Sequence, residues 1–119
     1  MKREEIKSYK DACKVIGRKP RTYKDKHSNL YEQLSTIIAA LNFISNGNKP
    51  WIPKFNYYYI YSWLHRKDGY NKPAGVFYLY SHFGLDSSFA AVGTSLKIKE
   101  REDGNYIIEN FKELLQDWF

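Results

Sequence analysis

The sequence predicts an α+β fold in which two N-terminal helices and one C-terminal helix pack on a three-stranded antiparallel β-meander, in the order α-α-β-β-β-α. Three segments show the apolar spacing of helices, and three consecutive segments show the alternation of strands. A length of 119 residues with 43% hydrophobic residues is typical of one domain with one core. We therefore expect residues 1–119 to form a single domain, with residues 18–28 as a basic connector.

The expected helices cover residues 3–16, 29–46 and 105–118. The second helix has the widest apolar stripe; Ser28 or Asn29 is expected to cap its N-terminus, and Asn46-Gly47 to end it. Asp103-Gly104-Asn105 offers an N-cap for the third helix, whose acidic start suits the positive end of the helix dipole. The predicted core residues are Leu34, Ile37, Ile38, Leu41, Leu96, Ile98, Phe111 and Leu115.

The expected strands cover residues 55–64, 75–83 and 91–99. Two prolines make residues 49–53 a rigid strap that leads into the sheet. Residues 65–74 contain Asp68-Gly69 and Pro73, which are typical of a long hairpin loop. The first two strands are apolar or aromatic on both faces, so either tyrosines cover the second face or that face binds a partner.

Positive charge is concentrated near the N-terminus. Residues 1–28 hold ten of the nineteen Lys and Arg residues and four acidic residues, for a net charge of +6. Residues 100–119 hold two basic and six acidic residues, for a net charge of −4. We therefore expect an acidic partner to meet the N-terminal third or the middle of the chain rather than the C-terminal helix.

Basic residues interleaved with aromatic ones favour a nucleic-acid-binding protein. A flexible basic arm would supply contacts to phosphates, and an aromatic sheet would supply flat rings on which bases stack. The candidate binding residues are Arg18, Lys19, Arg21, Lys24 and Lys26 on the arm and Tyr57, Tyr59, Tyr61, Trp63, Tyr78 and Tyr80 on the sheet. The alternative is a protein-interaction or virion-associated structural module that uses the same Tyr and Trp side chains, which are common in protein interfaces.

The sequence does not indicate an enzyme. His27, His65 and His82 lack the spacing of a metal site, and the single cysteine, Cys13, lies on an apolar helix stripe without a base placed beside it. The seven glycines match no phosphate-binding loop. We therefore expect no cofactor, no metal and no small-molecule substrate. A charged N-terminus and the lack of a long apolar run predict a cytoplasmic protein with no membrane partner.

Several short motifs along the chain carry a resemblance. They are Tyr9-Lys10-Asp11-Ala12-Cys13-Lys14, Gly17, Pro20, Ala40-Leu41-Asn42, Pro50-Trp51, Val92-Gly93, Leu96, Lys99, Tyr106 and Phe111. In these the chain resembles small uncharacterised proteins encoded by phages and prophages of gut bacteria. It departs from them at Thr94 and Ser95, where the relatives often have serine and arginine. The resemblance implies a mobile-element setting and no biochemical activity. In that setting a host or phage protein is the alternative partner to nucleic acid.

Overall fold

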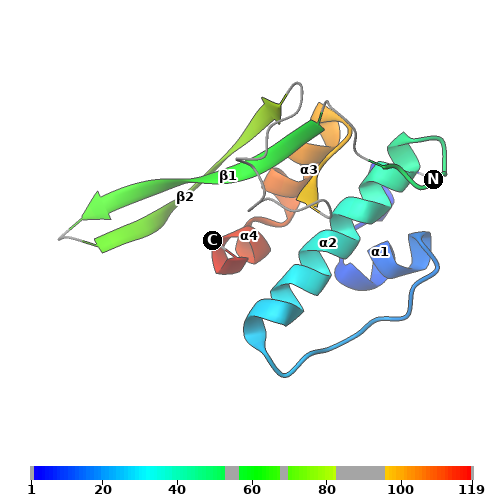
Figure 1. Cartoon of the computed structure of the whole chain (residues 1–119), viewed down its shortest axis with the longest axis horizontal. Helices are drawn as coiled ribbons and strands as arrows, with labels where there is room; N and C mark the ends of the chain where they lie inside the picture. The colour runs from blue at the N-terminus through cyan, green and yellow to red at the C-terminus, as the bar shows by residue number, and fades with distance from the viewer. Residues whose placement is uncertain (1, 53–56, 68–69, 83–95, 119) are drawn as a thin grey trace.

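The longest helix, α2 (Lys26–Ser45), is the element on which the other helices pack (Figure 1). The computed structural model describes residues 2–52, 57–67, 70–82 and 96–118, with side chains described outside residues 59–82. These residues are mostly helical. The other elements are the 3₁₀ turn η1 (Arg3–Glu5), α1 (Tyr9–Val15), β1 (Tyr57–Lys67), β2 (Tyr70–His82), α3 (Arg101–Asn110) and α4 (Lys112–Trp118).

The prediction of a three-stranded β-meander is wrong. Within the described ranges, the sheet contains two strands, β1 and β2, and residues 91–95 of the expected third strand lie outside those ranges. Ile98 forms only an isolated antiparallel bridge to Tyr58, through two hydrogen bonds of 2.8 Å. The side chain of Asn42 on α2 takes the flanking backbone groups, donating to the Lys97 carbonyl at 2.8 Å and accepting from the Lys99 N–H at 2.9 Å. Asn42 therefore satisfies the backbone groups that face away from β1, and Ile98 bridges β1 rather than β2, the neighbour that the meander predicted.

The hairpin strands are longer than predicted, and the expected loop over residues 65–74 is wrong. The register runs from Tyr57 opposite His82 to Lys67 opposite Tyr70, with an irregularity between Ser62 and Leu64. Pro73 has no N–H to donate. It is tolerated in β2 because β2 is an edge strand of a two-stranded sheet, where alternate N–H groups face outward and need no partner strand. Figure 1 shows the hairpin extending away from the helices.

The first predicted helix, residues 3–16, is also interrupted. Ser8 caps α1 by accepting a hydrogen bond from the Asp11 N–H at 3.3 Å, and Ile6 lies fully buried between η1 and α1. The second predicted helix is confirmed in outline, but it begins three residues earlier than expected. Asp25 is its N-cap, because the Asp25 carboxylate accepts hydrogen bonds of 2.8 Å from both the N–H and the hydroxyl of Ser28.

The third predicted helix, residues 105–118, is two helices that meet at the buried residue Phe111. Helix α3 begins four residues earlier than expected, with Glu100 as the flanking residue. Asp103, predicted as a cap, instead lies inside the helix with a fully buried side chain. Its carboxylate accepts hydrogen bonds from Arg3 Nε at 2.8 Å and from the Ser45 hydroxyl. These partners, which are distant in the sequence, hold Asp103 in its buried position.

All eight predicted core residues are buried, which confirms that part of the prediction. They pack in one cluster with Ile6, Ala12, Ala40 and Ile107. The N-terminal residues close this cluster, because the Tyr106 hydroxyl donates a hydrogen bond to the Ile6 carbonyl at 2.7 Å. Helices α1, α2, α3 and α4 thus enclose one core.

Candidate nucleic-acid interface

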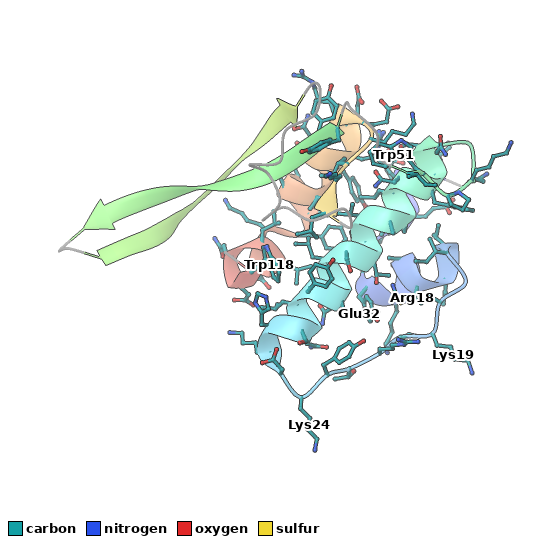
Figure 2. All side chains as sticks on the ribbon, in the orientation of Figure 1. Arg18, Lys19, Lys24, Glu32, Trp51 and Trp118 are labelled. Carbon is teal, nitrogen blue, oxygen red and sulfur yellow. The ribbon has the colours of Figure 1, made fainter. Side chains whose placement is uncertain are left out.

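Residues 16–25 connect α1 to α2, and the basic residues predicted to bind a partner are exposed there and at the start of α2. The predicted connector, 18–28, is too long, because residues 26–28 form the first turn of α2. Arg18, Lys19, Arg21, Lys24 and Lys26 are all exposed. The side chains of Lys19 and Lys24 point away from the helices (Figure 2). We call residues 18–26 the basic segment.

The basic segment follows a course fixed by hydrogen bonds, which corrects the expectation of a flexible arm. The Arg18 N–H donates to the Cys13 carbonyl at 2.8 Å, and the Arg21 N–H donates to the Tyr9 hydroxyl at 2.9 Å. The Tyr23 N–H donates to the Asn29 side chain at 3.3 Å. Both neighbouring helices therefore anchor the backbone, while the lysine side chains project into solvent.

Arg18 differs from the other basic residues because its guanidinium has partners inside the protein. Its Nη2 lies 3.4 Å from a carboxylate oxygen of Glu32, and its Nη1 donates to the Thr36 hydroxyl at 3.4 Å. Glu32 and Thr36 are both buried on α2, so Arg18 supplies the counter-charge for a buried carboxylate. Its side chain is still 39% exposed, but part of its charge is already neutralised.

Tyr9 is the centre of the polar network beneath the basic segment. Its hydroxyl accepts from Arg21 and donates to Glu32 Oε1 at 3.1 Å. Burial, together with hydrogen bonds with Cys13 and Glu32, raises the pKa of Tyr9 to about 12 despite the lowering effect of the Arg21 amide. Tyr9 is therefore a neutral phenol at physiological pH, and it positions the segment without carrying charge.

The aromatic half of the predicted site lies elsewhere. Tyr57 is only 4% exposed, and the Lys97 ammonium lies 4.5 Å from the centre of its ring. The backbone register sets Tyr59 opposite Tyr80 and Tyr61 opposite Tyr78, and it shifts at Trp63; the side chains of these five residues lie outside the described ones. Figure 1 shows the hairpin and the connector before α2 on different sides of the molecule. The structure therefore does not bring the two halves of the predicted site together.

A different aromatic group lies beside the basic segment. The rings of His27 and Trp118 are stacked, with centroids 4.6 Å apart and an angle of 22° between their planes. The ring of Tyr31 lies 5.9 Å from that of Trp118 and is tilted by 42°. We call these three residues the aromatic cluster. This cluster was not predicted, because His27 was expected in the connector. A helix beginning at Lys26 puts His27 and Tyr31 four residues apart on one face.

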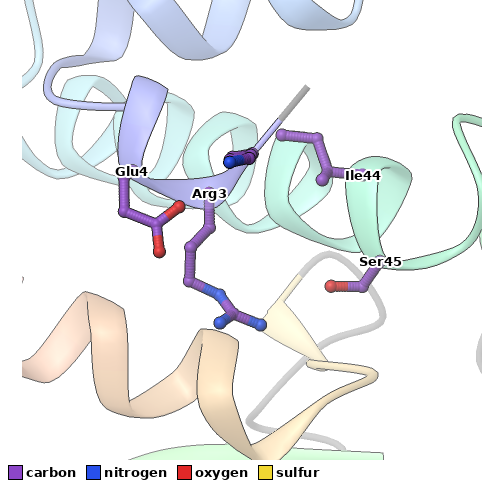
Figure 3. Close-up of a pocket in the computed structure, with 5 residues that line it drawn as sticks. Arg3, Glu4, Ile44 and Ser45 are labelled. Carbon is purple, nitrogen blue, oxygen red and sulfur yellow. The ribbon is translucent and has the colours of Figure 1, made fainter.

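A cavity of about 370 Å³ lies between the N-terminal turn and the end of α2. Its lining residues are Lys2, Arg3, Glu4, Ile44 and Ser45 (Figure 3). Arg3, its most basic group, is already paired with Asp103, and Ser45 donates to the same carboxylate. These groups hold the N-terminal residues against α3. Their polar atoms have structural partners, and we assign no ligand to the cavity.

In the described part of the chain, no group of three His, Cys, Asp or Glu side chains is arranged to hold a metal ion. Among the helices of that same part, none combines the length and apolar character needed to cross a membrane. Comparison of the chain with family models, with curated proteins and with solved structures finds no match.

Proposed function

We propose that the protein acts by binding nucleic acid, and that the basic segment contacts the phosphates. The observation that carries this proposal is a set of exposed cationic side chains on a backbone that hydrogen bonds hold in place: Lys19, Arg21, Lys24 and Lys26. A fixed backbone lowers the entropic cost of presenting these charges to a partner. Residues 1–28 carry a net charge of +6, and positive charge attracts a phosphate backbone.

Binding of this kind has a measurable signature in its salt dependence. Each phosphate neutralised by Lys or Arg releases counterions, so the logarithm of the association constant falls with the logarithm of salt concentration by about 0.9 per contact on duplex DNA. Lys19, Lys24 and Lys26 have no internal ion pair among the described residues, whereas Arg18 is paired with Glu32. Arg21 also has no ion pair among these residues, so the three lysines supply three of the four phosphate contacts expected on the basic segment.

The test is a titration of the protein into labelled single-stranded and duplex oligonucleotides at low and at physiological salt. The test variant changes Lys19, Lys24 and Lys26 to Ser. The control variant changes three other exposed lysines, Lys2, Lys49 and Lys112, to Ser and so loses the same net charge. We expect the test variant to bind weakly, with a salt slope on duplex smaller by about 2 to 3, and the control to stay close to the parent.

Two results would overturn the proposal. The first is a parent protein that binds neither oligonucleotide at low salt. The second is an equal loss of affinity in both variants, which would attribute binding to net charge rather than to the basic segment.

A second candidate function is binding of a protein through the tyrosine-rich hairpin, either as an interaction module or as part of a virion. The observation that favours it is the extension of β1 and β2 beyond the helices (Figure 1). An interface of aromatic side chains depends on salt far less than a phosphate interface does. Complex formation with a host or phage protein that is insensitive to salt would support this candidate.

A further inference from the structure

We propose that the nucleic acid is single-stranded and that its bases stack on the aromatic cluster of His27, Tyr31 and Trp118. This inference rests on the proposed function: the basic segment contacts the phosphates of the strand, and the aromatic cluster contacts its bases. It also moves the stacking surface from the hairpin tyrosines, where the sequence placed it, to the junction of α2 and α4.

The three rings of the cluster form a platform that combines residues of α2 and α4. His27 and Tyr31 lie four residues apart on α2 and so share one face of the helix. Trp118, at the end of α4, stacks on His27 at 4.6 Å and contacts Tyr31 at 5.9 Å. Trp118 also packs against the hydrophobic core, which fixes its ring. Rings held in this way are already oriented before a ligand arrives, and preorganisation favours binding.

The cluster remains open to solvent although its rings are large. His27 is exposed, Tyr31 is 38% exposed, and Trp118 is half-buried. An exposed aromatic ring can accept a base of any sequence, because every base has a π-face. In a duplex those faces are covered by neighbouring base pairs, so a stacking surface of this kind selects single strands.

The charges around the cluster match a strand that lies along the start of α2. Lys24 and Lys26 immediately precede His27 in the chain and are exposed. The carboxylate of Asp25, between them, is engaged by Ser28 as the cap of α2. On the other side Asp117 and Glu113 are exposed on α4 and would repel phosphate. The backbone of a bound strand therefore lies on the α2 side, with its bases directed toward Trp118.

The test separates bases from phosphates by comparing dT12 with an abasic strand of the same length and charge. Fluorescence anisotropy at low salt gives both affinities. We expect the parent to bind dT12 about tenfold more tightly than the abasic strand, and more tightly than a dT12·dA12 duplex. We expect Tyr31→Leu and Trp118→Leu each to reduce this preference severalfold while leaving the affinity for the abasic strand unchanged.

The matched control is Trp51→Leu. Trp51 is also half-buried, but it follows the opposite end of α2 (Figure 2), so this variant should keep the full preference for dT12. Because Trp118 packs against the core, thermal unfolding checks that each variant is folded, and Tyr31→Leu tests the cluster with a more exposed side chain.

The outcomes distinguish this inference from the proposed function. Equal, salt-sensitive binding of dT12 and the abasic strand by the parent would overturn the inference and leave the proposed function standing. Tighter binding of the duplex than of dT12 would also overturn the inference alone, as would a preference that survives in Tyr31→Leu. No binding of any strand at low salt would overturn both.

Discussion

The Nε of Arg3 lies 2.8 Å from Oδ1 of Asp103, and this contact joins the N-terminal turn to the first turn of α3. The Asp103 side chain is fully buried, and its second oxygen accepts a hydrogen bond from Ser45 at the end of α2. The hydrogen bond to Asp103 raises the pKa of Arg3 above its already high ordinary value, so Arg3 is charged at any physiological pH. Three segments far apart in the sequence thus meet at one carboxylate.

Replacement of Arg3 by Met should lower the free energy of unfolding by about 1 to 3 kcal/mol, because it leaves a buried carboxylate without its counter-charge. Water reaches Arg3, which keeps the cost below that of a fully buried pair. Urea denaturation measures the change. Lys2→Met is the control, since Lys2 is exposed, and it should change stability by less than about 0.5 kcal/mol. Equal effects of the two substitutions would show that the Arg3 contact does not contribute.

Replacement of Arg18 by Met should affect stability more than nucleic-acid binding. It removes the counter-charge of buried Glu32, which we expect to lower the free energy of unfolding by about 1 kcal/mol. Lys19→Met should have the opposite pattern, with a stability change within about 0.5 kcal/mol and a smaller salt slope of binding. Urea denaturation and oligonucleotide titration of both variants measure the two effects. If Arg18→Met reduced the salt slope as much as Lys19→Met, the structural role assigned to Arg18 would be wrong.

Ionisation of Tyr9 should destabilise the fold at alkaline pH. In the unfolded chain a tyrosine ionises at a pKa of about 10, whereas burial raises the pKa of Tyr9 in the folded protein to about 12. The neutral phenol therefore stabilises the fold fully below the unfolded pKa, and this stabilisation is lost as pH rises through the folded pKa.

Tyr9→Phe provides the measurement of this effect. The variant should be less stable than the parent at pH 8 by about 1 kcal/mol because it lacks the hydrogen bonds to Glu32 and Arg21. The difference between parent and variant should shrink as the pH rises from about 10 to about 12, because only the parent has this ionisation. Urea denaturation at several pH values measures it. A difference that stays constant over that range would contradict the prediction.

Replacement of Leu41 by Ala should lower the free energy of unfolding by about 2 to 5 kcal/mol, because it removes a fully buried side chain from the centre of α2 and leaves a cavity. Thermal or urea unfolding measures the change. Ile52→Ala is the control, because Ile52 is 75% exposed and its truncation should cost less than about 0.5 kcal/mol. A Leu41→Ala variant as stable as the parent would remove Leu41 from the core.

The core could be predicted from the sequence because burial follows the apolar period of a helix, which is a local signal. Leu34, Ile37, Ile38 and Leu41 are buried on α2 as that period requires. The helix start was wrong by three residues because Asp25 and Ser28 are both good caps, and the sequence does not say which of them the backbone will use. With α2 beginning at Lys26, His27 and Tyr31 lie on one face of the helix. An error of three residues in the predicted start of this helix therefore hid the candidate stacking surface.

The errors in the sheet and in the third helix have a different cause, since both depend on long-range polar partners. The alternation around Ile98 is typical of a strand, yet Asn42 on α2 takes the backbone groups on either side of it. Asp103 has the sequence context of a cap, yet Arg3 and Ser45 hold it inside α3. Contacts of this kind join residues more than fifty positions apart, and no pattern within a short window records them.

The contacts of residues 3 and 6 with residues 103 and 106 also set an order of events during synthesis. Ribosomes add about 5 to 20 residues per second, so about 5 to 20 seconds separate the synthesis of Arg3 from that of Asp103. Throughout that interval Ile6, which is fully buried in the finished protein, has no α3 to pack against. Arg3 and Ile6 therefore reach their final places only after α3 has been synthesised, although they are made long before it.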